Sequence, residues 1–206
     1  MNNNVFPTKG NLIQTKRSLD LARVGFELLD RKRNIMLREM MSRMSEIEEV
    51  QSRIDSTFFA AYYALQKAHV TVGQHTVSQI AETVEITDDI QLRLRSVMGV
   101  DIPEVTLEEQ KATLHYGFHN STASLDDAYV NFIKVKELVA QLAAIENSVY
   151  RLAYSIKQAQ KRANALKNIV IPNLDETVVF ITSYLEEKDR EEFTTLKVIK
   201  RAKEGD

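Results

Sequence analysis

The chain has 206 residues, with 27 Lys and Arg against 29 Asp and Glu, and it contains no cysteine. The balanced charge argues against a strongly basic nucleic-acid binder, and the missing cysteine excludes disulfides, Cys-ligated metals and a thiol nucleophile. The longest apolar run, 58–65, is far shorter than the roughly 20 residues of a membrane-spanning helix. The first residues lack a basic and an apolar stretch, so we expect a cytoplasmic protein with no signal peptide and no membrane insertion.

Helix breakers are rare, because the chain has only six Gly and three Pro. Region 1–72 also carries a seven-residue apolar repeat, which is typical of a coiled-coil helix. The repeat predicts one helix from about residue 8 to about residue 70, roughly 90 Å long at about 1.5 Å per residue. We call its sixteen residues the N-terminal seam: Leu12, Thr15, Leu19, Ala22, Phe26, Leu29, Arg33, Met36, Met40, Arg43, Ile47, Val50, Ile54, Thr57, Ala61 and Ala64.

Two seam residues, Arg33 and Arg43, are charged, and a charge weakens close pairing of two helices. Two interpretations remain open for them. Either the helix faces a different partner at these points, or the apolar stem packs while the charged head reaches solvent.

Region 73–120 has a different pattern and predicts a small β-hairpin with its connecting segments. Apolar and polar residues alternate over 84–87, over 91–97 and over 100–105, as in half-buried strands. Met98 and Gly99 form a plausible turn between the last two strands, and Pro103 confines the second of them to an edge. The region carries eight acids and three bases, so this part of the molecule is acidic.

Region 121–206 again has the spacing of a coiled-coil helix. Apolar residues follow each other by four and three from Leu138 to Val170, and the steps after Leu166 then become four, four and four. Pro172 lies within this change of phase, so a bend or a local distortion of the helix is expected there. The predicted fold is therefore mainly α: N- and C-terminal helices form a long antiparallel two-helix coiled coil, with a β-hairpin inserted in the middle of one elongated unit.

No arrangement of residues predicts catalysis. His115 and His119 share a helical spacing, but no third ligand lies nearby, and a surface or packing role is the simpler interpretation. Phosphate-binding glycine motifs and the nucleophile motif Gly-x-Ser-x-Gly are missing. We therefore expect no enzyme activity, no cofactor and no metal.

Two surfaces stand out instead. The segment 9–43 carries nine bases against four acids, and the segment 58–65 is apolar on all sides of its helix. A helix in a two-helix pair buries only one side, so the second segment predicts a further element or another protein packed against it. The methionines Met36, Met40, Met41 and Met44 either fill the core or form an adaptable binding surface.

Short sequence motifs at both ends of the chain resemble those of the D subunit of the V-type (archaeal and bacterial A/V-type) ATPases. They are Asn164-Ala165-Leu166 with Ile171-Pro172, and Arg190-Glu191-Glu192-Phe193, supported near the N-terminus by Leu28-Leu29-Asp30-Arg31-Lys32-Arg33. The order, the length and the small middle insert fit as well. The resemblance implies a non-catalytic rotor shaft that transmits torque between a hexamer of A and B subunits and the membrane ion-translocating ring.

The resemblance also implies the partners: the F subunit, the A/B hexamer and the adaptor subunit of the membrane ring, on the inner face of the membrane. The expected hexamer contacts are basic: Lys9, Lys16, Arg17, Arg23, Arg31, Lys32, Arg33, Lys161, Arg162 and Lys167. The expected F-subunit contacts are apolar: Met36, Met40, Ile47, Phe59, Tyr62, Tyr63, Ile145, Val149 and Leu152. An unrelated coiled-coil scaffold and the stalk of a flagellar-export ATPase are the alternatives.

Overall fold

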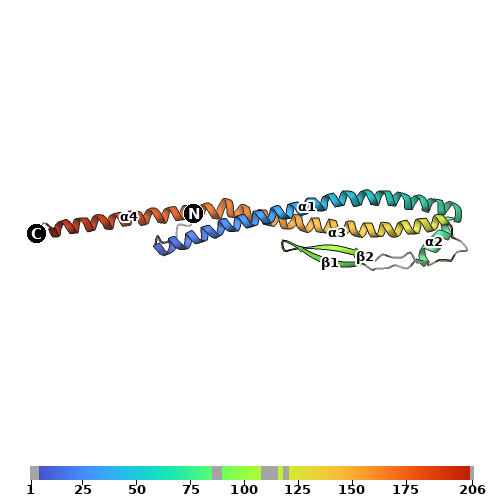
Figure 1. Cartoon of the computed structure of the whole chain (residues 1–206), viewed down its shortest axis with the longest axis horizontal. Helices are drawn as coiled ribbons and strands as arrows, with labels where there is room; N and C mark the ends of the chain where they lie inside the picture. Colours follow the sequence, from blue (N-terminus) through green and yellow to red (C-terminus); the bar gives the residue numbers. More distant parts are fainter. Residues whose placement is uncertain (1–4, 85–89, 108–115, 118–120, 205–206) are drawn as a thin grey trace. The chain divides into compact units, whose positions relative to one another are not determined.

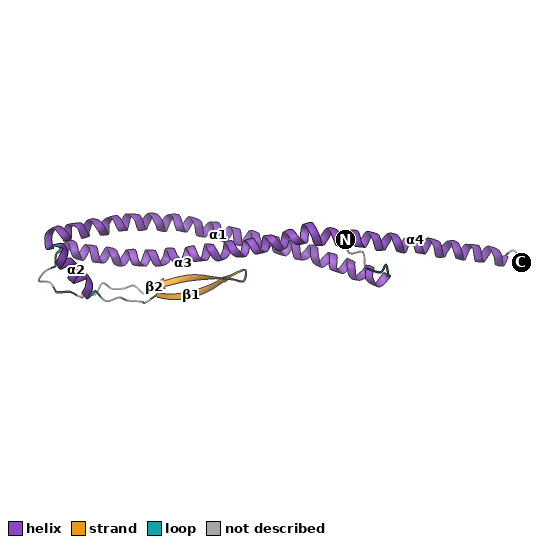
Figure 2. Cartoon of the chain, turned by 180° about the vertical axis from the view of Figure 1, so that it is seen from behind, coloured by secondary structure: helices purple, strands orange, loops and turns teal. Residues whose placement is uncertain are grey.

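The computed structural model describes residues 5–84, 90–107, 116–117 and 121–204 (Figure 1). Helix α1 spans Lys9–Val72 and helix α2 spans Gln74–Thr83. Strands β1, Ile90–Val97, and β2, Val100–Leu107, follow. Helix α3, Ala123–Ala165, continues through the π-helical segment η2, Leu166–Val170, into helix α4, Ile171–Glu204 (Figure 2).

The predicted fold class is confirmed, since long N- and C-terminal helices flank a small antiparallel sheet. The chain divides into two compact units. The first unit contains residues 1–34 and 157–206, and the second contains residues 35–156. In the first unit Arg23 pairs with Asp175 and Arg33 with Gln160, and in the second Ile54 clusters with Leu138 and Ala68 with Leu125, so the paired helices are antiparallel in both.

The N-terminal seam forms the core as the repeat predicts. None of its sixteen residues is exposed, and seven of them, Leu19, Ala22, Met36, Val50, Ile54, Ala61 and Ala64, are buried. On the opposite helices the residues of the four-three pattern are buried or half-buried from Leu138 to Leu166. Many of the buried residues are alanines, which let the two helix backbones approach closely.

The π-helical segment η2 explains the change of phase seen in the sequence. After Leu166 the apolar residues are spaced by four, four and four, which is one residue more than the usual spacing of four, three and four. Because each residue turns an α-helix by about 100°, this extra residue would rotate the later apolar residues away from the partner helix. In η2 the N–H of Ile171 donates to the carbonyl of Leu166, five residues back, so the extra residue is absorbed. Leu174 and Ile181 therefore return to the packed side, and Ile181 is fully buried. The expected local distortion is confirmed.

The hairpin matches its predicted strands closely. The register pairs Val97 with Val100 across the two turn residues, Met98 and Gly99. Both turn residues have positive φ, 51° and 76°, the left-handed conformation that two-residue hairpin turns of type I′ require. The third alternating stretch, 84–87, is not tested, because residues 85–89 lie outside the described residues.

Helix α2 has no counterpart in the sequence prediction. It packs where α1 ends and α3 begins, through a cluster of Ala68, Val77 and Leu125. Gly73 connects α1 to α2 with a φ of 93°, a conformation that side-chain-bearing residues rarely adopt. Beside this cluster lies an apolar cleft of about 220 Å³, lined in part by Ile80 and Phe132.

Candidate interaction surfaces

The described residues contain no cluster of His, Asp or Glu that could hold a metal ion. Within the same residues, no helix is long and apolar enough to cross a membrane. His115 and His119 lie outside the described residues. What the described chain offers are surfaces of two kinds, charged and apolar, together with a docked hairpin.

The ten basic residues expected to contact a hexamer all belong to the first unit. Lys32 and Arg33 are half-buried, and the other eight are exposed. Several already have partners within the unit: Arg23 lies 3.0 Å from Asp175, Arg31 3.7 Å from Glu27, and Lys9 3.9 Å from Asp189. The ammonium group of Lys167 lies 5.9 Å from the ring centre of Phe26.

The contacts of Arg33 explain how a charged residue is accommodated in the seam. Its guanidinium donates to the amide oxygen of Gln160 at 2.7 Å and lies 2.7 Å from Asp30. The residue therefore cross-links the two helices of its own unit. In the described part of the chain, Lys16, Arg17, Lys32, Lys161 and Arg162 form no ion pair with an acid, so these five present unneutralised charge.

The apolar candidates for the F subunit belong to the second unit and differ in exposure. Phe59 is 78% exposed, and Tyr62 and Tyr63 are exposed as well. Met40, Ile47, Ile145 and Val149 are half-buried along the helix pair. Met36 and Leu152 are fully buried, so in this chain they hold the helices together and have no free surface for a partner.

Two of the three exposed aromatic candidates, Tyr62 and Tyr63, have contacts that order their rings. Tyr62 stacks on Phe58 with ring centres 5.7 Å apart and meets Phe132 of α3 edge-on at 5.5 Å. The ammonium group of Lys67 lies 4.6 Å from the ring centre of Tyr63. Pairs of this kind fix the rings of Tyr62 and Tyr63 in place before any partner arrives.

The structure also exposes apolar residues that were not chosen from the sequence. Among them are Met41, Met44, Tyr150 and Tyr154 on the helices and Leu92 and Leu94 on the hairpin. A simple signal could have found the helical ones, because each is a large apolar residue outside the seam. Met41 and Met44 had been noted only as part of the methionine cluster.

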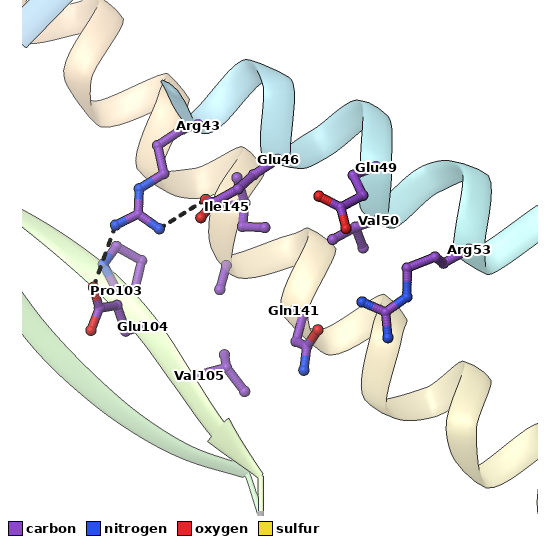
Figure 3. Close-up of a pocket in the computed structure, with 11 residues that line it drawn as sticks. Arg43, Glu46, Glu49, Val50, Arg53, Pro103, Glu104, Val105, Gln141 and Ile145 are labelled. Carbon is purple, nitrogen blue, oxygen red and sulfur yellow. Dashed lines mark hydrogen bonds and ion pairs between the residues drawn. The ribbon is translucent and has the colours of Figure 1, made fainter. Parts of the chain in front are cut away.

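Arg43, the second charged seam residue, faces the hairpin (Figure 3). Its side chain is 15% exposed and lies 3.0 Å from Glu46, 3.4 Å from Glu39 and 3.4 Å from Glu104 of β2. Burial lowers the pKa of Arg43, but its attraction and hydrogen bond to Glu46, and then the charges of Glu39 and Glu104, outweigh burial and raise it. Beside this cluster lies a cavity of about 400 Å³.

Helix α3 holds β2 by two further polar contacts. Arg151 donates to the carbonyl of Asp101 at 3.0 Å. The buried hydroxyl of Ser148 bonds the carbonyl of Ala144 at 2.7 Å and lies 3.2 Å from the carbonyl of Pro103. Ile102, which is fully buried, adds apolar packing. The hairpin is thus docked through β2, with Arg43 as its charged contact to α1.

Comparison with known proteins gives a consistent result along the whole chain. Residues 11–201 match the family described as the ATP synthase D subunit. The V-type ATP synthase D subunit of Thermotoga neapolitana is 43% identical over 196 residues, covering 95% of this chain and 97% of the relative. The A-type ATP synthase D subunit of Thermococcus kodakarensis is 34% identical over 200 residues, with 96% and 94% covered. That of Pyrococcus abyssi is 33% identical over 197 residues, with 94% and 92% covered. The chain belongs to the family of ATP synthase D subunits.

Proposed function

We propose that this protein is the central-stalk rotor subunit of a rotary V/A-type ATPase and transmits torque between the A/B hexamer and the membrane ring. The observation that carries the proposal is a family match over nearly the whole chain together with a helix of 64 residues that no loop interrupts. A shaft must resist twisting, and two packed helices with a continuous buried seam resist it. The same observation favours the rotor over an unrelated scaffold or a flagellar-export stalk.

The first unit is proposed to enter the hexamer. On both of its helices it carries bases that pair with no acid among the described residues: Lys16, Arg17, Lys32, Lys161 and Arg162. Contacts between exposed charges are screened by salt and individually weak, so they hold a rotating surface without locking it. Arg33 contributes differently in this proposal, because its charge is used to join the two helices.

The aromatic surface of the second unit is proposed to bind the F subunit. Exposed aromatic residues that are already ordered offer a large contact area at low entropic cost. Phe59, Tyr62 and Tyr63 form its centre, and the half-buried Met40, Ile47, Ile145 and Val149 border the same helix pair. The apolar cleft at α2 is proposed to meet the adaptor subunit of the membrane ring. The protein itself performs no catalysis in this proposal and works at the inner face of the membrane.

Reconstitution tests the proposal directly. The chain is mixed with an A/B hexamer, with and without the F subunit, and co-elution and bead rotation under ATP are followed. Stable insertion and unidirectional rotation are expected. A folded, helical chain that does not bind the hexamer would refute the rotor assignment.

Two matched variants separate the surfaces. The double variant Lys161→Gln and Arg162→Gln should weaken torque or coupling, whereas Lys134→Gln, a lysine of the second unit, should not. Phe59→Asp should weaken binding of the F subunit by at least tenfold, because its exposed ring has no core role. Tyr150→Asp, an equally exposed aromatic residue on α3, is its control. Equal effects of variant and control would refute the placement of that surface.

A further inference from the structure

Strand β1 has an unpaired backbone edge within the described sheet, and the turn of the hairpin defines which groups point along it. In a hairpin closed by two residues, the flanking pair Val97 and Val100 exchanges both hydrogen bonds. Alternation then makes Arg95 and Arg93 bond to β2 as well. The backbone N–H and C=O groups of Leu92, Leu94 and Ser96 must point the other way, away from β2.

Contacts on the far side of β2 support the same pattern independently. The carbonyl of Asp101, which lies opposite Ser96, accepts a hydrogen bond from Arg151 of α3. The carbonyl of Pro103, which lies opposite Leu94, faces the hydroxyl of Ser148 on the same helix. Since these carbonyls point toward α3, the groups opposite them on β1 point outward. Both views of the chain place β2 between α3 and β1 (Figures 1 and 2). The described sheet has two strands, so within it nothing pairs with this outer edge.

β1 has few of the features that usually protect such an edge. Natural edge strands are usually short, or carry charged side chains, a proline, a bulge or a covering element, and of these β1 has only the charges of Arg93 and Arg95. β1 is eight residues long and has no proline, and its residues 91–96 are all exposed. Leu92 is 66% exposed and Leu94 is 67% exposed, and both lie on one face of the sheet. β2 differs, because it carries Pro103 and is covered by α3.

Charge indicates what kind of strand would fit. β1 contains Arg93 and Arg95 and no acid. The strand it already accepts, β2, places Glu104 opposite Arg93 and 3.5 Å from Arg95, and apolar Val105 opposite Leu92. Two β1 strands paired antiparallel about Leu94 would instead place Arg93 against Arg95 of the other copy, which is repulsive. A second copy of this chain is therefore disfavoured.

We propose that the outer edge of β1 accepts an extended strand of a partner protein in which acidic and apolar residues alternate, extending the hairpin to three strands. Such β-strand addition uses the backbone groups of Leu92, Leu94 and Ser96 for affinity. Arg93 and Arg95 select the acidic partner, and the two leucines pack on its apolar side chains. The inference rests on the proposed function for the source of the partner, which is another subunit of the same assembly.

Hydrogen exchange at single-residue resolution tests the inference. The free chain is compared with the same tagged chain purified in complex with the other subunits. The amides of Leu92, Leu94 and Ser96 should exchange rapidly in the free chain and at least tenfold more slowly in the assembly. The amides of Arg93 and Arg95 should already be protected in the free chain, since β2 pairs with them. This alternation separates strand addition from simple coverage of the surface.

Leu94→Pro removes the central outward N–H without removing a bond to β2, just as Pro103 is tolerated opposite it. In an assembly carrying this variant, the amides of Leu92 and Ser96 should return to the free-chain rate. Leu94→Thr, which keeps the N–H, should retain their protection. Protected amides of Arg93 and Arg95 in both variants would show that the hairpin is intact.

Each remaining outcome overturns the inference in a distinct way. Assembly without slower exchange at Leu92, Leu94 and Ser96 refutes strand addition and leaves the rotor assignment standing. A folded chain that joins no assembly refutes the rotor assignment and, with no strand supplied, this inference too. Slower exchange in the free chain at high concentration, with a doubled mass in sedimentation, would replace the acidic partner by a second copy.

Discussion

The ion pair between Arg43 and Glu104 should stabilise the docked hairpin measurably. The two charged groups lie 3.4 Å apart, where Coulomb attraction is about 5 kcal/mol at an effective dielectric constant of about 20 and about 1 kcal/mol in bulk water. Arg43 is 15% exposed, but Glu104 is 42% exposed, and the guanidinium is shared with Glu39 and Glu46. A coupling of about 1 kcal/mol is therefore expected, near the upper end for solvent-accessible pairs.

A double-mutant cycle isolates this coupling. Arg43→Met keeps an apolar stem, Glu104→Gln keeps the shape of the side chain, and the double variant closes the cycle. A two-stranded hairpin is only marginally stable on its own, so undocking should let its ladder amides exchange. Exchange at Ile102 then reports docking, and about 1 kcal/mol corresponds to roughly a fivefold change in rate.

The control is Glu46→Gln, which removes a closer partner of Arg43 on the same helix and should affect the hairpin less. Raising the salt concentration should reduce the coupling, because part of the pair is exposed. A coupling below about 0.3 kcal/mol, or an equal effect of Glu46→Gln on exchange at Ile102, would refute the assignment of Arg43 as the charged contact of the hairpin.

Three further substitutions test other parts of the fold. Gly25→Ala should raise the free energy of unfolding by about 0.5–1 kcal/mol in chemical denaturation, because a methyl group there meets only Leu166, at 3.7 Å. Pro172→Ala should leave the π-helical segment in place, since the seam requires the extra residue, and hydrogen exchange over 166–171 would detect a change. Tyr116→Phe should cost about 1–2 kcal/mol by removing the 2.5 Å hydrogen bond to Asp126.

Outcomes of the opposite kind would contradict each of these. A destabilised Gly25→Ala would mean that the helices of the first unit cannot accept the methyl group. Conversion of residues 166–170 to α-helix in Pro172→Ala would show that the proline, and not the packing, holds the distortion. An unchanged free energy of unfolding in Tyr116→Phe would show that the hydrogen bond to Asp126 adds no net stability.

Tyr116 also has a test in the unmodified protein. Burial, and then the hydrogen bond and charge of Asp126, raise the pKa of Tyr116 well above its usual value. The stability it contributes is present below about pH 10 and is lost as the pH rises further, because the unfolded chain then loses that proton first. In an absorbance titration, one of the seven tyrosines should ionise at a higher pH than the others. If this last ionisation step is missing from the Tyr116→Phe variant, the step belongs to Tyr116.

Periodicity was sufficient to predict most of the fold. The seam and the hairpin register depend on patterns local to the sequence, namely the repeat of seven, the alternation of two and the Met98-Gly99 turn. The partner of Arg43 could not be predicted, because Glu104 lies 61 residues away and only tertiary packing brings it near. Helix α2 was missed although Val77, Ile80 and Ala81 have the three-and-four spacing of a helix face, because ten residues are too few for that spacing to repeat.

The candidate surfaces were predicted in part, for a related reason. Residue type and seam position indicate which side chains are basic or apolar, and most of the basic candidates are exposed. They do not indicate whether a seam residue is fully covered, as Met36 and Leu152 are, or whether a base is already neutralised, as Arg23 is by Asp175. Those distinctions depend on how the neighbouring helix is placed.

The π-helical segment also bears on how this protein can change length during evolution. An inserted residue elsewhere in a packed helix turns every later side chain by about 100° and moves the apolar stripe out of the core. Segment η2 confines that rotation to five residues, so Ile181 is still buried. Removing one residue from 166–170 should therefore yield a regular helix with Ile181 still buried, which the accessibility of a cysteine at position 181 would report. Deletion of a single residue should be tolerated here and rejected in the regular part of α3.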